Sequence, residues 1–520
     1  MWSLPSYLSA DDNAMEAGHL ASTRSLPWLN DRYVSALLLG LPVTLILLAI
    51  LINNHGMFIY TLDDPYIHIA LAKQIFNGHY GINPNEFSAP SSSIIWPFIL
   101  APFALFGSAM IYAPFALNLI FAFLTLSLLI KLLAGINPLG KLIILGGFCL
   151  ATNFYGLIFT GMEHSLQIYL VILIACAVLN KEFGSTAVTP AAVYVALILL
   201  PLTRYEGLAV SIPVLAYLFY LGERRAAMIS TAIMLALVVG FSLFLHHLGL
   251  GYVPSSVIAK TNMAGLPALI FNILSQSDKY GWVILIQLFI CALYFDRKPL
   301  VLMLITVTIL HTLFGRWGWF GRYEVYWLVF VGVFALHACR SCMRERHMTA
   351  LFAMLPVAFA TLVNSTLSVP LASAAIYNQQ YSTSMIIRDL HEPVAVNDLG
   401  LVALYGDQYI LDLWGLGSIQ ALNYRKTETG VEWMSTLMAE KDVHYAVVYA
   451  EWFPDIPKNW TEVAHMRLTI PKASTASQQV FYYATDAESV KKLKTVMERF
   501  RDQTPRGKFV LEYPEVAVVQ

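Results

Sequence analysis

The amino-acid sequence contains uninterrupted apolar runs that are long enough to cross a lipid bilayer. The first, at residues 34–53, reads VSALLLGLPVTLILLAILIN and holds no charged side chain. About 20 such residues span the hydrocarbon core of a membrane as a helix. The chain is 58% hydrophobic and 12% charged, with a mean hydropathy of +0.62, whereas soluble proteins carry about twice that charged fraction. These runs predict a mainly α-helical, polytopic membrane protein.

Further apolar runs bring the expected number of transmembrane helices to about eleven. They lie near residues 109–131, 142–160, 165–179, 188–203, 207–221, 227–247, 281–295, 299–315, 325–339 and 349–367. The run at 94–106 is short and contains two prolines, so we expect a re-entrant or interfacial segment there. If it does span the membrane, another of the early helices is assigned wrongly.

Basic clusters set the expected orientation. They occur in NKEF at 180–183, GERRA at 222–226, FDRK at 295–298 and CRSCMRERH at 339–347. Cytoplasmic loops of membrane proteins are enriched in Lys and Arg, so we place all four clusters in the cytoplasm. Eleven spans then put the N-terminus inside and the C-terminus outside. Residues 1–32 lack the basic start and cleavage site of a secretory signal, so we expect the first run to remain as a helix.

The sequence predicts three parts: a cytoplasmic tail at 1–33, a transmembrane domain at 34–368 and a small extracytoplasmic α/β domain at 369–520. The transmembrane part includes a large first outer loop at 54–93. In the last part PVAVND, HYAVVYA and QVFYYAT predict short strands, and ESVKKLKTVMERFRD predicts an amphipathic helix. The chain shows no internal repeat, which disfavours transporters built from inverted halves. It also has no basic excess, since its net charge is −1, so we expect no nucleic-acid partner.

Two adjacent carboxylates, Asp63 and Asp64, follow the first span in the stretch IYTLDDPYIH. Carboxylates are costly in lipid, so we expect this pair to face water or a cavity. One of them can act as a general base while the other holds a cation or orients a substrate hydroxyl. The alternative is a solvated pair that only marks the membrane boundary.

Basic residues also fall on the expected outer side, against the positive-inside trend. They are Arg204 in PLTRYEG, Lys260 in PSSVIAKTN, and Arg316 and Arg322 in FGRWGWFGRYEVYW. Such cations indicate a bound anion, and at membrane depth the obvious anion is a lipid phosphate, which Arg holds bidentately and Lys holds as a point charge. The alternative is ion pairing of the arginines with Glu206 or Glu324.

Two further polar residues, Glu163 and His164 in FTGMEHSL, also lie on the outer side at the start of a helix. They are either ligands for an acceptor or a metal, or ordinary polar loop residues. An aromatic cluster between Trp317 and Trp327 either anchors the chain at the membrane interface or stacks on a sugar ring.

As a set, these motifs resemble the GT-C glycosyltransferases, membrane enzymes that use polyprenyl-phosphate-linked sugars. The stretch DDPYIHIALAKQIFNGHYGINPNEFSAPSSSIIWP is similar to the first outer loop of the bacterial arabinofuranosyltransferase-like branch. Other similar motifs follow in the same order: GMEHSL, LTRYEGL, VPSSVIAK, GRYEVYW and VAVNDLGLVALYGDQYILDLWGLGS. The resemblance covers residues from about 60 to 420, and it departs from the family where PSSV replaces the more usual Asn-Thr pair.

The resemblance implies an inverting transfer of a sugar from a polyprenyl-phosphate donor to a cell-envelope glycan or lipid acceptor. It places the enzyme in the bacterial inner (plasma) membrane, with its chemistry on the outer face. Asp63 is the expected general base, beside Asp64 as the second catalytic carboxylate. The expected phosphate-binding residues are Lys260, Arg204, Arg322 and Arg316. The expected acceptor- or cation-orienting residues are Glu163, His164, Tyr66 and His68.

The resemblance leaves the cofactor open, because GT-C enzymes include metal-dependent and metal-independent members. A divalent cation, with Asp63, Asp64 and Glu163 as its candidate ligands, is compatible with the sequence but not required. The alternative function is a transporter or flippase for a lipid-linked sugar, which would also use outer cations but predicts charges in mid-membrane. In the outer domain, the aromatic residues of WGLG and YAEWF either bind a growing glycan or belong to a domain that covers the membrane site.

Overall fold

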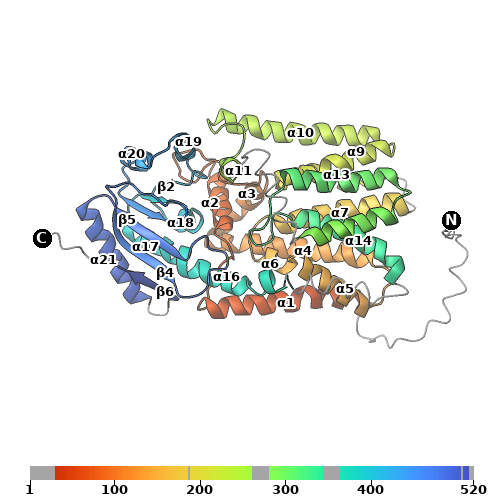
Figure 1. Cartoon of the computed structure of the whole chain (residues 1–520), viewed down its shortest axis with the longest axis horizontal. Coiled ribbons are helices and arrows are strands. Elements are labelled where there is room, and N and C mark those ends of the chain that lie inside the picture. The colour runs from red at the N-terminus through yellow and green to blue at the C-terminus, as the bar shows by residue number, and fades with distance from the viewer. Residues whose placement is uncertain are drawn as a thin grey trace, which may run out of the picture.

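The computed structural model describes residues 30–184, 188–260, 280–343, 360, 362–504 and 507–514. A bundle of apolar helices forms one end of the elongated molecule and an α/β domain forms the other (Figure 1). Within the described ranges, four helical segments are long and apolar enough to cross a membrane. They are α1 (Asp31–Asn53), the segment Trp96–Leu132, α7 (His164–Phe183) and α10 (Arg224–His247).

Shorter apolar helices complete the bundle. They are α5 (Pro138–Ala151), α8 (Ala191–Thr203), η3 (Tyr205–Gly207) continued by α9 (Leu208–Tyr220), the helix Tyr280–Leu293, α13 (Lys298–Phe314) and α14 (Val325–Met343). Large apolar side chains on the outer faces remain exposed; on α1, for example, Leu45 is 58% and Ile52 78% exposed. In water such a surface would be unfavourable, whereas lipid covers it at no cost. The chain is therefore a multi-pass membrane protein.

The predicted eleven spans are borne out only in part, because the described residues contain four long spans and a set of shorter apolar helices. Most of the predicted span at 349–367 lies outside the described residues. The predicted span at 142–160 is wrong as a single helix. Asn153 adopts a left-handed backbone with φ of 50°, so α5 ends before it and the short α6 (Phe154–Ile158) begins after it.

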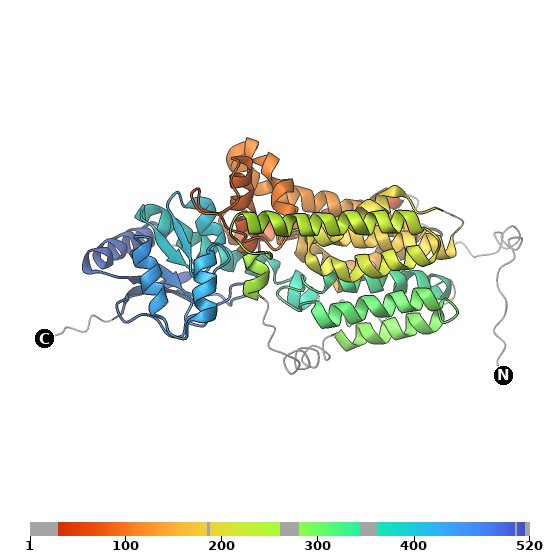
Figure 2. The ribbon, with the colours of Figure 1, turned by 90° about the horizontal axis from the view of Figure 1, so that it is seen from above.

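The short proline-containing run at 94–106 forms α3 (Trp96–Leu100) and most of the 3-10 helix η2 (Ala101–Tyr112), which leads into α4 (Ala113–Leu132). Gly107, with φ of 58° and ψ of −129°, interrupts the helical backbone within this run. The helices α2 (Asp64–Phe76) and α3 lie at the end of the bundle that faces the α/β domain, whereas α4 runs along the bundle (Figures 1 and 2). The first outer loop thus lies at the junction of the two parts.

The α/β domain contains a mixed six-stranded sheet in the order β2-β1-β3-β5-β4-β6. Its strands are β1 (Val394–Val396), β2 (Ile410–Asp412), β3 (Tyr445–Val448), β4 (Thr461–Leu468), β5 (Gln479–Ala484) and β6 (Phe509–Glu512). Strand β1 pairs in parallel with β2 and β3, and the remaining pairings are antiparallel. The predicted strands in PVAVND, HYAVVYA and QVFYYAT and the predicted helix, α21 (Ala487–Gln503), are confirmed.

Helices cover both faces of this sheet. One face packs against α17 (Ser382–Leu390) and α21, and the other against α19 (Ile419–Thr427) and α20 (Glu432–Glu440). Ile67 and Leu71 of α2 belong to the same buried cluster as Val394 and Val396 of β1. The helix of the first outer loop is therefore part of the core of the α/β domain.

Several connections join the bundle to the α/β domain. Some are hydrogen bonds, such as those between Asn83 and Ile410 and between Glu86 and Tyr409, and two others involve packed helices. The helices α16 (Val369–Ile376), η5 (Tyr377–Tyr381) and α17 follow one another without a break, and α16 lies beside the end of α1 (Figure 1). There Ser373 Oγ accepts a hydrogen bond from Asn54 Nδ2 and donates one to the carbonyl of Ile59. The second connection is the packing of α2 against α18 (Gly400–Tyr405). These contacts hold the two parts in a defined arrangement.

Candidate functional site

Loops from distant parts of the sequence meet where the bundle faces the α/β domain. The loop before α2 supplies Asp63 and Asp64, the loop before α7 supplies Glu163, the junction of α8 and η3 supplies Arg204, and the loop between α13 and α14 supplies Arg322. The backbone N–H of Thr61 donates to the carbonyl of Phe159, which ties the first two loops together. Most of the polar residues chosen from the sequence are therefore brought into one region.

The two adjacent carboxylates have different partners. Asp63 is buried, and its Oδ2 and Oδ1 accept hydrogen bonds from the backbone N–H groups of Gly400 (2.5 Å) and Leu401 (2.9 Å). Asp64 is partly exposed, and its Oδ2 lies 2.6 Å from Nη2 of Arg322. Asp63 thus binds the start of α18 in the α/β domain, whereas Asp64 pairs with a cation of the membrane domain.

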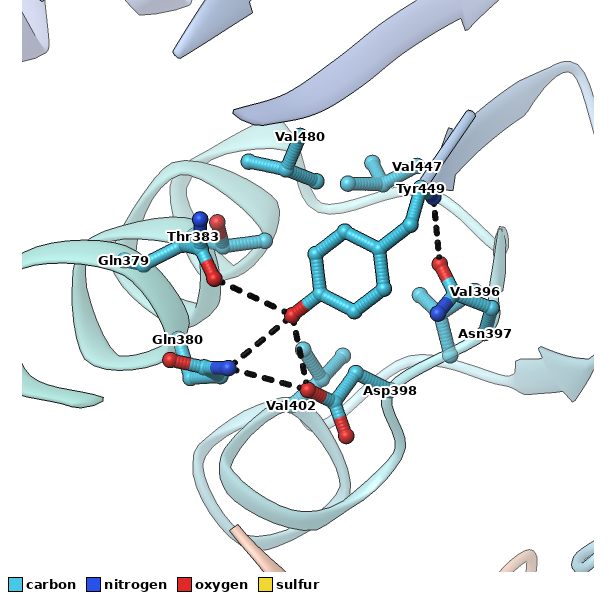
Figure 3. A pocket seen from close by; sticks show the side chains of 10 residues that line it. All are labelled: Gln379, Gln380, Thr383, Val396, Asn397, Asp398, Val402, Val447, Tyr449 and Val480. Atoms are coloured by element: carbon cyan, nitrogen blue, oxygen red, sulfur yellow. Dashed lines mark hydrogen bonds between the residues drawn. The ribbon is translucent and has the colours of Figure 1, made fainter. Parts of the chain in front are cut away.

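A second carboxyl group, from Asp398, faces Asp63. The two carboxyl groups hydrogen-bond to each other. Asp398 Oδ2 also accepts from Gln380 Nε2 (3.0 Å) and from the hydroxyl of Tyr449 (2.8 Å), as Figure 3 shows. Burial and the charge of Asp398 raise the pKa of Asp63 well above its ordinary value, and burial also raises the pKa of Asp398.

The cavity beside this carboxyl pair has a volume of only about 20 Å³. It is lined by side chains of η5, α17 and the sheet, among them Gln379, Thr383 and Asn397 (Figure 3). A volume of this size holds about one water molecule. The Asp63–Asp398 pair therefore belongs to a closed hydrogen-bond network that joins the two domains, with no room for a sugar.

This carboxyl pair predicts a pH-dependent stability. The pKa of Asp63 is near 3.8 in the unfolded chain and is raised well above 3.8 in the folded chain. At a pH between these two pKa values, the folded state therefore binds more protons than the unfolded state does. The stabilisation that Asp63 contributes is complete below pH 3.8, and it is lost as the pH rises through the raised pKa of the folded chain. Asp398→Asn keeps the hydrogen bonds and removes one charge, so we expect the apparent Tm to fall less with rising pH than in the wild type. Thermal melts from pH 5 to 8 measure this.

The matched control for this pH experiment is Asp407→Asn, since Asp407 is an exposed residue of the same domain. It should keep the pH dependence of the wild type. Equal slopes for Asp398→Asn and the wild type would show that the carboxyl pair does not share a proton in the folded state.

Arg322 is a deeply buried cation of the site, with 2% of its side chain exposed. Its Nη2 contacts Asp64 and the hydroxyl of Tyr323, whereas Nε and Nη1 have no hydrogen-bond partner in the described part of the protein. Buried guanidinium nitrogens are normally paired, because burying an unpaired charge is costly. Two buried donors of Arg322 are thus available to an acceptor group of a bound molecule.

Three arginines surround the ring of Tyr323. The guanidinium carbons of Arg204, Arg316 and Arg322 lie 5.2, 5.3 and 5.1 Å from the centre of this ring. Arg316 is exposed, whereas the other two side chains are buried. The three cations predicted on the outer side therefore converge, although nearby carboxylates neutralise part of their charge.

Arg204 has carboxylate partners on two sides. Its Nη1 lies 2.8 Å from Glu163 Oε1, and its Nη2 lies 3.0 Å from Glu206 Oε1. The backbone of Arg204 is extended, with φ of −156°, so residues two apart can meet here although they would not on a helix. The alternative of ion pairing with Glu206 is thus realised. Arg322 pairs with Asp64, whereas Glu324 accepts hydrogen bonds from the N–H of Gly318 (2.9 Å) and from the hydroxyl of Tyr280.

Glu163 and its neighbours form the buried floor of the site. Glu163 Oε2 lies 3.9 Å from Nε2 of His68, whose Nδ1 is 3.1 Å from the hydroxyl of Ser91. His164 is fully buried, and neither ring nitrogen has a hydrogen-bond partner among the described residues. The hydroxyl of the buried Tyr66 accepts from the N–H of Tyr60 (2.9 Å), which orders the loop before α2.

The remaining candidates fit less well. The backbone of Lys260 ends α11 (Ser255–Lys260), but its side chain lies outside the described part of the structure. The candidate metal ligands Asp63, Asp64 and Glu163 are not brought together, because each carboxylate has different partners. The described residues contain no group of three or more His, Cys, Asp or Glu side chains that could hold a metal ion. These three residues therefore do not fit a shared cation site.

Sequence reasoning did not identify Asp398 or Gly400 as partners of the acidic pair. Both lie in VAVNDLGLVALY, whose start predicts a short strand and which belongs to one of the motifs of the resemblance. Asp63 and Gly400 are separated by 337 positions, and no local pattern records a contact between them. The only signal in the sequence was the Asp-Leu-Gly turn itself, since Gly at such a turn permits close approach of another backbone.

Comparisons with known proteins add the following. A family model described as "Domain of unknown function (DUF8728)" matches residues 374–483. No curated protein matches the chain. The structure is similar to ArnT from Cupriavidus metallidurans in the apo state, with a TM-score of 0.51 and 11% identity over 86% of this chain and 98% of that one. This likeness shows that the chain shares the fold of that protein.

Two structures of the Archaeoglobus fulgidus oligosaccharyltransferase are also similar. The complex with Zn and sulfate has a TM-score of 0.45 and 13% identity, over 86% of this chain and 73% of that one. The apo form has a TM-score of 0.47 and 11% identity, over 88% and 75% of the two chains.

Proposed function

We propose that this protein transfers a sugar from a polyprenyl-phosphate donor to a cell-envelope glycan or lipid acceptor, with inversion. The observation that carries this proposal is the pairing of Asp64 with Arg322, whose Nε and Nη1 are buried without partners among the described residues. The partly exposed carboxylate of Asp64 can take the proton of an acceptor hydroxyl. The two available donors of Arg322 can bind the leaving phosphate. The GT-C fold supports the same function.

The geometry favours Asp64, rather than Asp63, as the general base. Both oxygens of Asp63 are bound by backbone N–H groups, and burial, together with the charge of Asp398, raises the pKa of Asp63 well above its ordinary value. A general base must be ionised and must come within hydrogen-bond reach of the hydroxyl. The side chain of Asp64 is 19% exposed, so a hydroxyl can reach it. Asp63 is then a positioning residue that fixes the start of α2.

The reaction follows from this assignment. The acceptor oxygen attacks the anomeric carbon of the donor while its proton passes to Asp64, and the bond from that carbon to the phosphate oxygen breaks. The electron pair of the broken bond stays on polyprenyl phosphate, which leaves. Arg322 lies against Asp64 and offers its two other nitrogens to the phosphate, so it stabilises the charge that grows there. A single displacement inverts the anomeric carbon.

The other basic residues take supporting roles in this proposal. Arg316 is exposed beside the same Tyr323 ring and attracts the anionic donor. Arg204 is neutralised by Glu163 and Glu206, so its part is to hold the loops together. Lys260 stays a predicted phosphate ligand. We also propose that the site and the α/β domain lie on the outer face of the bacterial inner membrane.

The test is an assay of the purified protein with a panel of polyprenyl-phosphate sugars, following the release of polyprenyl phosphate. Arg322→Gln should reduce turnover by about 10²–10³-fold, because it removes a donor to the leaving group. A melt in the same detergent shows whether the variant is folded. Arg297→Gln is the control, since Arg297 pairs with Glu182 near the end of α7 that is remote from the site.

Two results would contradict the proposal. One is full turnover by folded Arg322→Gln protein. The other is donor binding by the wild type without any transfer or hydrolysis, which would favour a transporter of lipid-linked sugars.

A further inference from the structure

A second cavity lies between the end of α1, the helices η5 and α17, and the end of α21. Its volume is about 420 Å³, which is within the range of about 300–1,000 Å³ usual for small-molecule sites. It is separate from the Asp64–Arg322 pair, and neither of these residues lines it. No function has been assigned to it so far.

Aromatic rings form one wall of this cavity. The rings of Tyr377 and Tyr381 stack with centres 5.3 Å apart and an angle of 15° between their planes. The ring of His55 meets Tyr377 edge-on at 6.3 Å. Both tyrosines belong to η5, a single π-helical turn, and such turns are rare and occur often at functional sites.

The rest of the lining mixes the apolar side chains of Met57, Met385 and Phe500 with polar groups whose charges are balanced. Arg388 and Asp389 both line the cavity, and their side chains lie 3.3 Å apart, so each offsets the charge of the other. The amide of Gln503 and the hydroxyl of Thr504 add neutral hydrogen-bonding partners, whereas the amide of Asn378 is bonded to the backbone of Ala374 and Lys508. A free phosphate or an anionic lipid headgroup would need an excess of positive charge, which this lining does not provide. The lining suits a neutral molecule with many hydroxyl groups and an apolar ring face.

We propose that this cavity binds a neutral sugar unit of the acceptor. That the sugar belongs to an acceptor rests on the proposed function. The binding of a sugar in this cavity can be tested independently of that function. Stacked aromatic rings accept the apolar face of a pyranose or furanose ring, while the amide of Gln503 and the Arg388–Asp389 pair bind its hydroxyl groups.

The position of the cavity suits an extended acceptor. His55 lines it and is nine positions from Asp64, so about 30 Å of chain at most separates the two. An acceptor with several sugar units can therefore occupy the cavity and present its last hydroxyl to Asp64. Binding energy from such a remote unit can be used to orient the reacting hydroxyl.

The experiment uses the full chain in lipid nanodiscs, prepared without glycoside detergents. Saturation-transfer NMR then tests the binding of the methyl glycosides of five sugars: glucose, galactose, mannose, arabinose and N-acetylglucosamine. We expect at least one of the five to bind. Tyr381→Ala and Tyr377→Ala should each weaken its binding by roughly two- to tenfold, because each loses one ring contact. Tyr377→Phe keeps the ring and should bind like the wild type.

Tyr220→Ala is the matched control, since Tyr220 is 68% exposed at the end of α9 and does not line the cavity. Asp64→Asn should bind the same sugar as the wild type, so a failure of the proposed chemistry and a failure of the sugar site give different results. The proposal is overturned if none of the five glycosides binds, or if folded Tyr377→Ala and Tyr381→Ala bind them unchanged. It is also overturned if anionic lipid in the nanodisc displaces the sugar, because the occupant is then a lipid headgroup.

Discussion

Replacing Asp64 with Asn is expected to reduce sugar transfer by about 10²–10⁴-fold, the usual contribution of a general base. The amide keeps the size of the side chain but cannot take the proton of the attacking hydroxyl. The carboxylate of Asp64 is bound to Arg322 at 2.6 Å, so the substitution also weakens the hold on that guanidinium. Turnover of the polyprenyl-phosphate sugar measures the loss, and binding of the same donor shows whether the site remains formed.

The comparison that decides between the two carboxylates is Asp63→Asn. Because both oxygens of Asp63 accept backbone N–H groups, the amide must place its own N–H₂ against one of them. We expect a less stable protein whose folded fraction still transfers sugar. If folded Asp63→Asn protein is inactive while Asp64→Asn protein retains turnover, the base is Asp63, as the sequence alone predicts.

Replacing Gly400 with Ala is expected to destabilise the junction of the two domains by about 3 kcal/mol, from overpacking and from loss of charged hydrogen bonds. A β-carbon at this position would lie 2.6 Å from Asp63 Oδ2 and would also collide with the backbone carbonyl of Asp63. The backbone of α2 would have to move away from α18. A lower apparent Tm and faster proteolysis of the α/β domain would report this separation.

Gly430→Ala is the control for this substitution, because a β-carbon there would meet no atom within 4 Å. It should change the stability by no more than about 0.5 kcal/mol, as surface substitutions usually do. Equal melting of Gly400→Ala and the wild type would mean that the contact between α2 and α18 contributes little to the stability.

Sequence patterns predicted the features that depend on neighbouring residues. Apolar runs gave the membrane character, and the helix at 487–503 was expected from its amphipathic period. Strand β4, TEVAHMRL, was missed because charged and polar side chains interrupt its apolar residues. The break at Asn153 was missed because an apolar run favours a single helix, while one left-handed residue is enough to end it.

The sequence predicted several of the residues of the site, but not which of them contact one another. Asp64 and Arg322 were both chosen from the sequence, yet their contact joins residues 258 positions apart. Asp63 looked equivalent to Asp64 because the two are adjacent and identical. Their roles separate only when the fold directs one side chain towards the backbone of Gly400 and the other towards Arg322. Such a distinction depends on tertiary packing, which a single sequence does not record.

The contact between Asp63 and Gly400 also constrains when the protein can become complete during its synthesis. Asp63 leaves the ribosome 337 residues before the backbone group that binds it. At translation rates of roughly 5–20 residues per second, this delay is about 15 to 70 seconds. During that time the first loop lacks the partner that fixes the start of α2. A nascent chain already inserted in the membrane therefore remains inactive until its last domain has been made and folded against it.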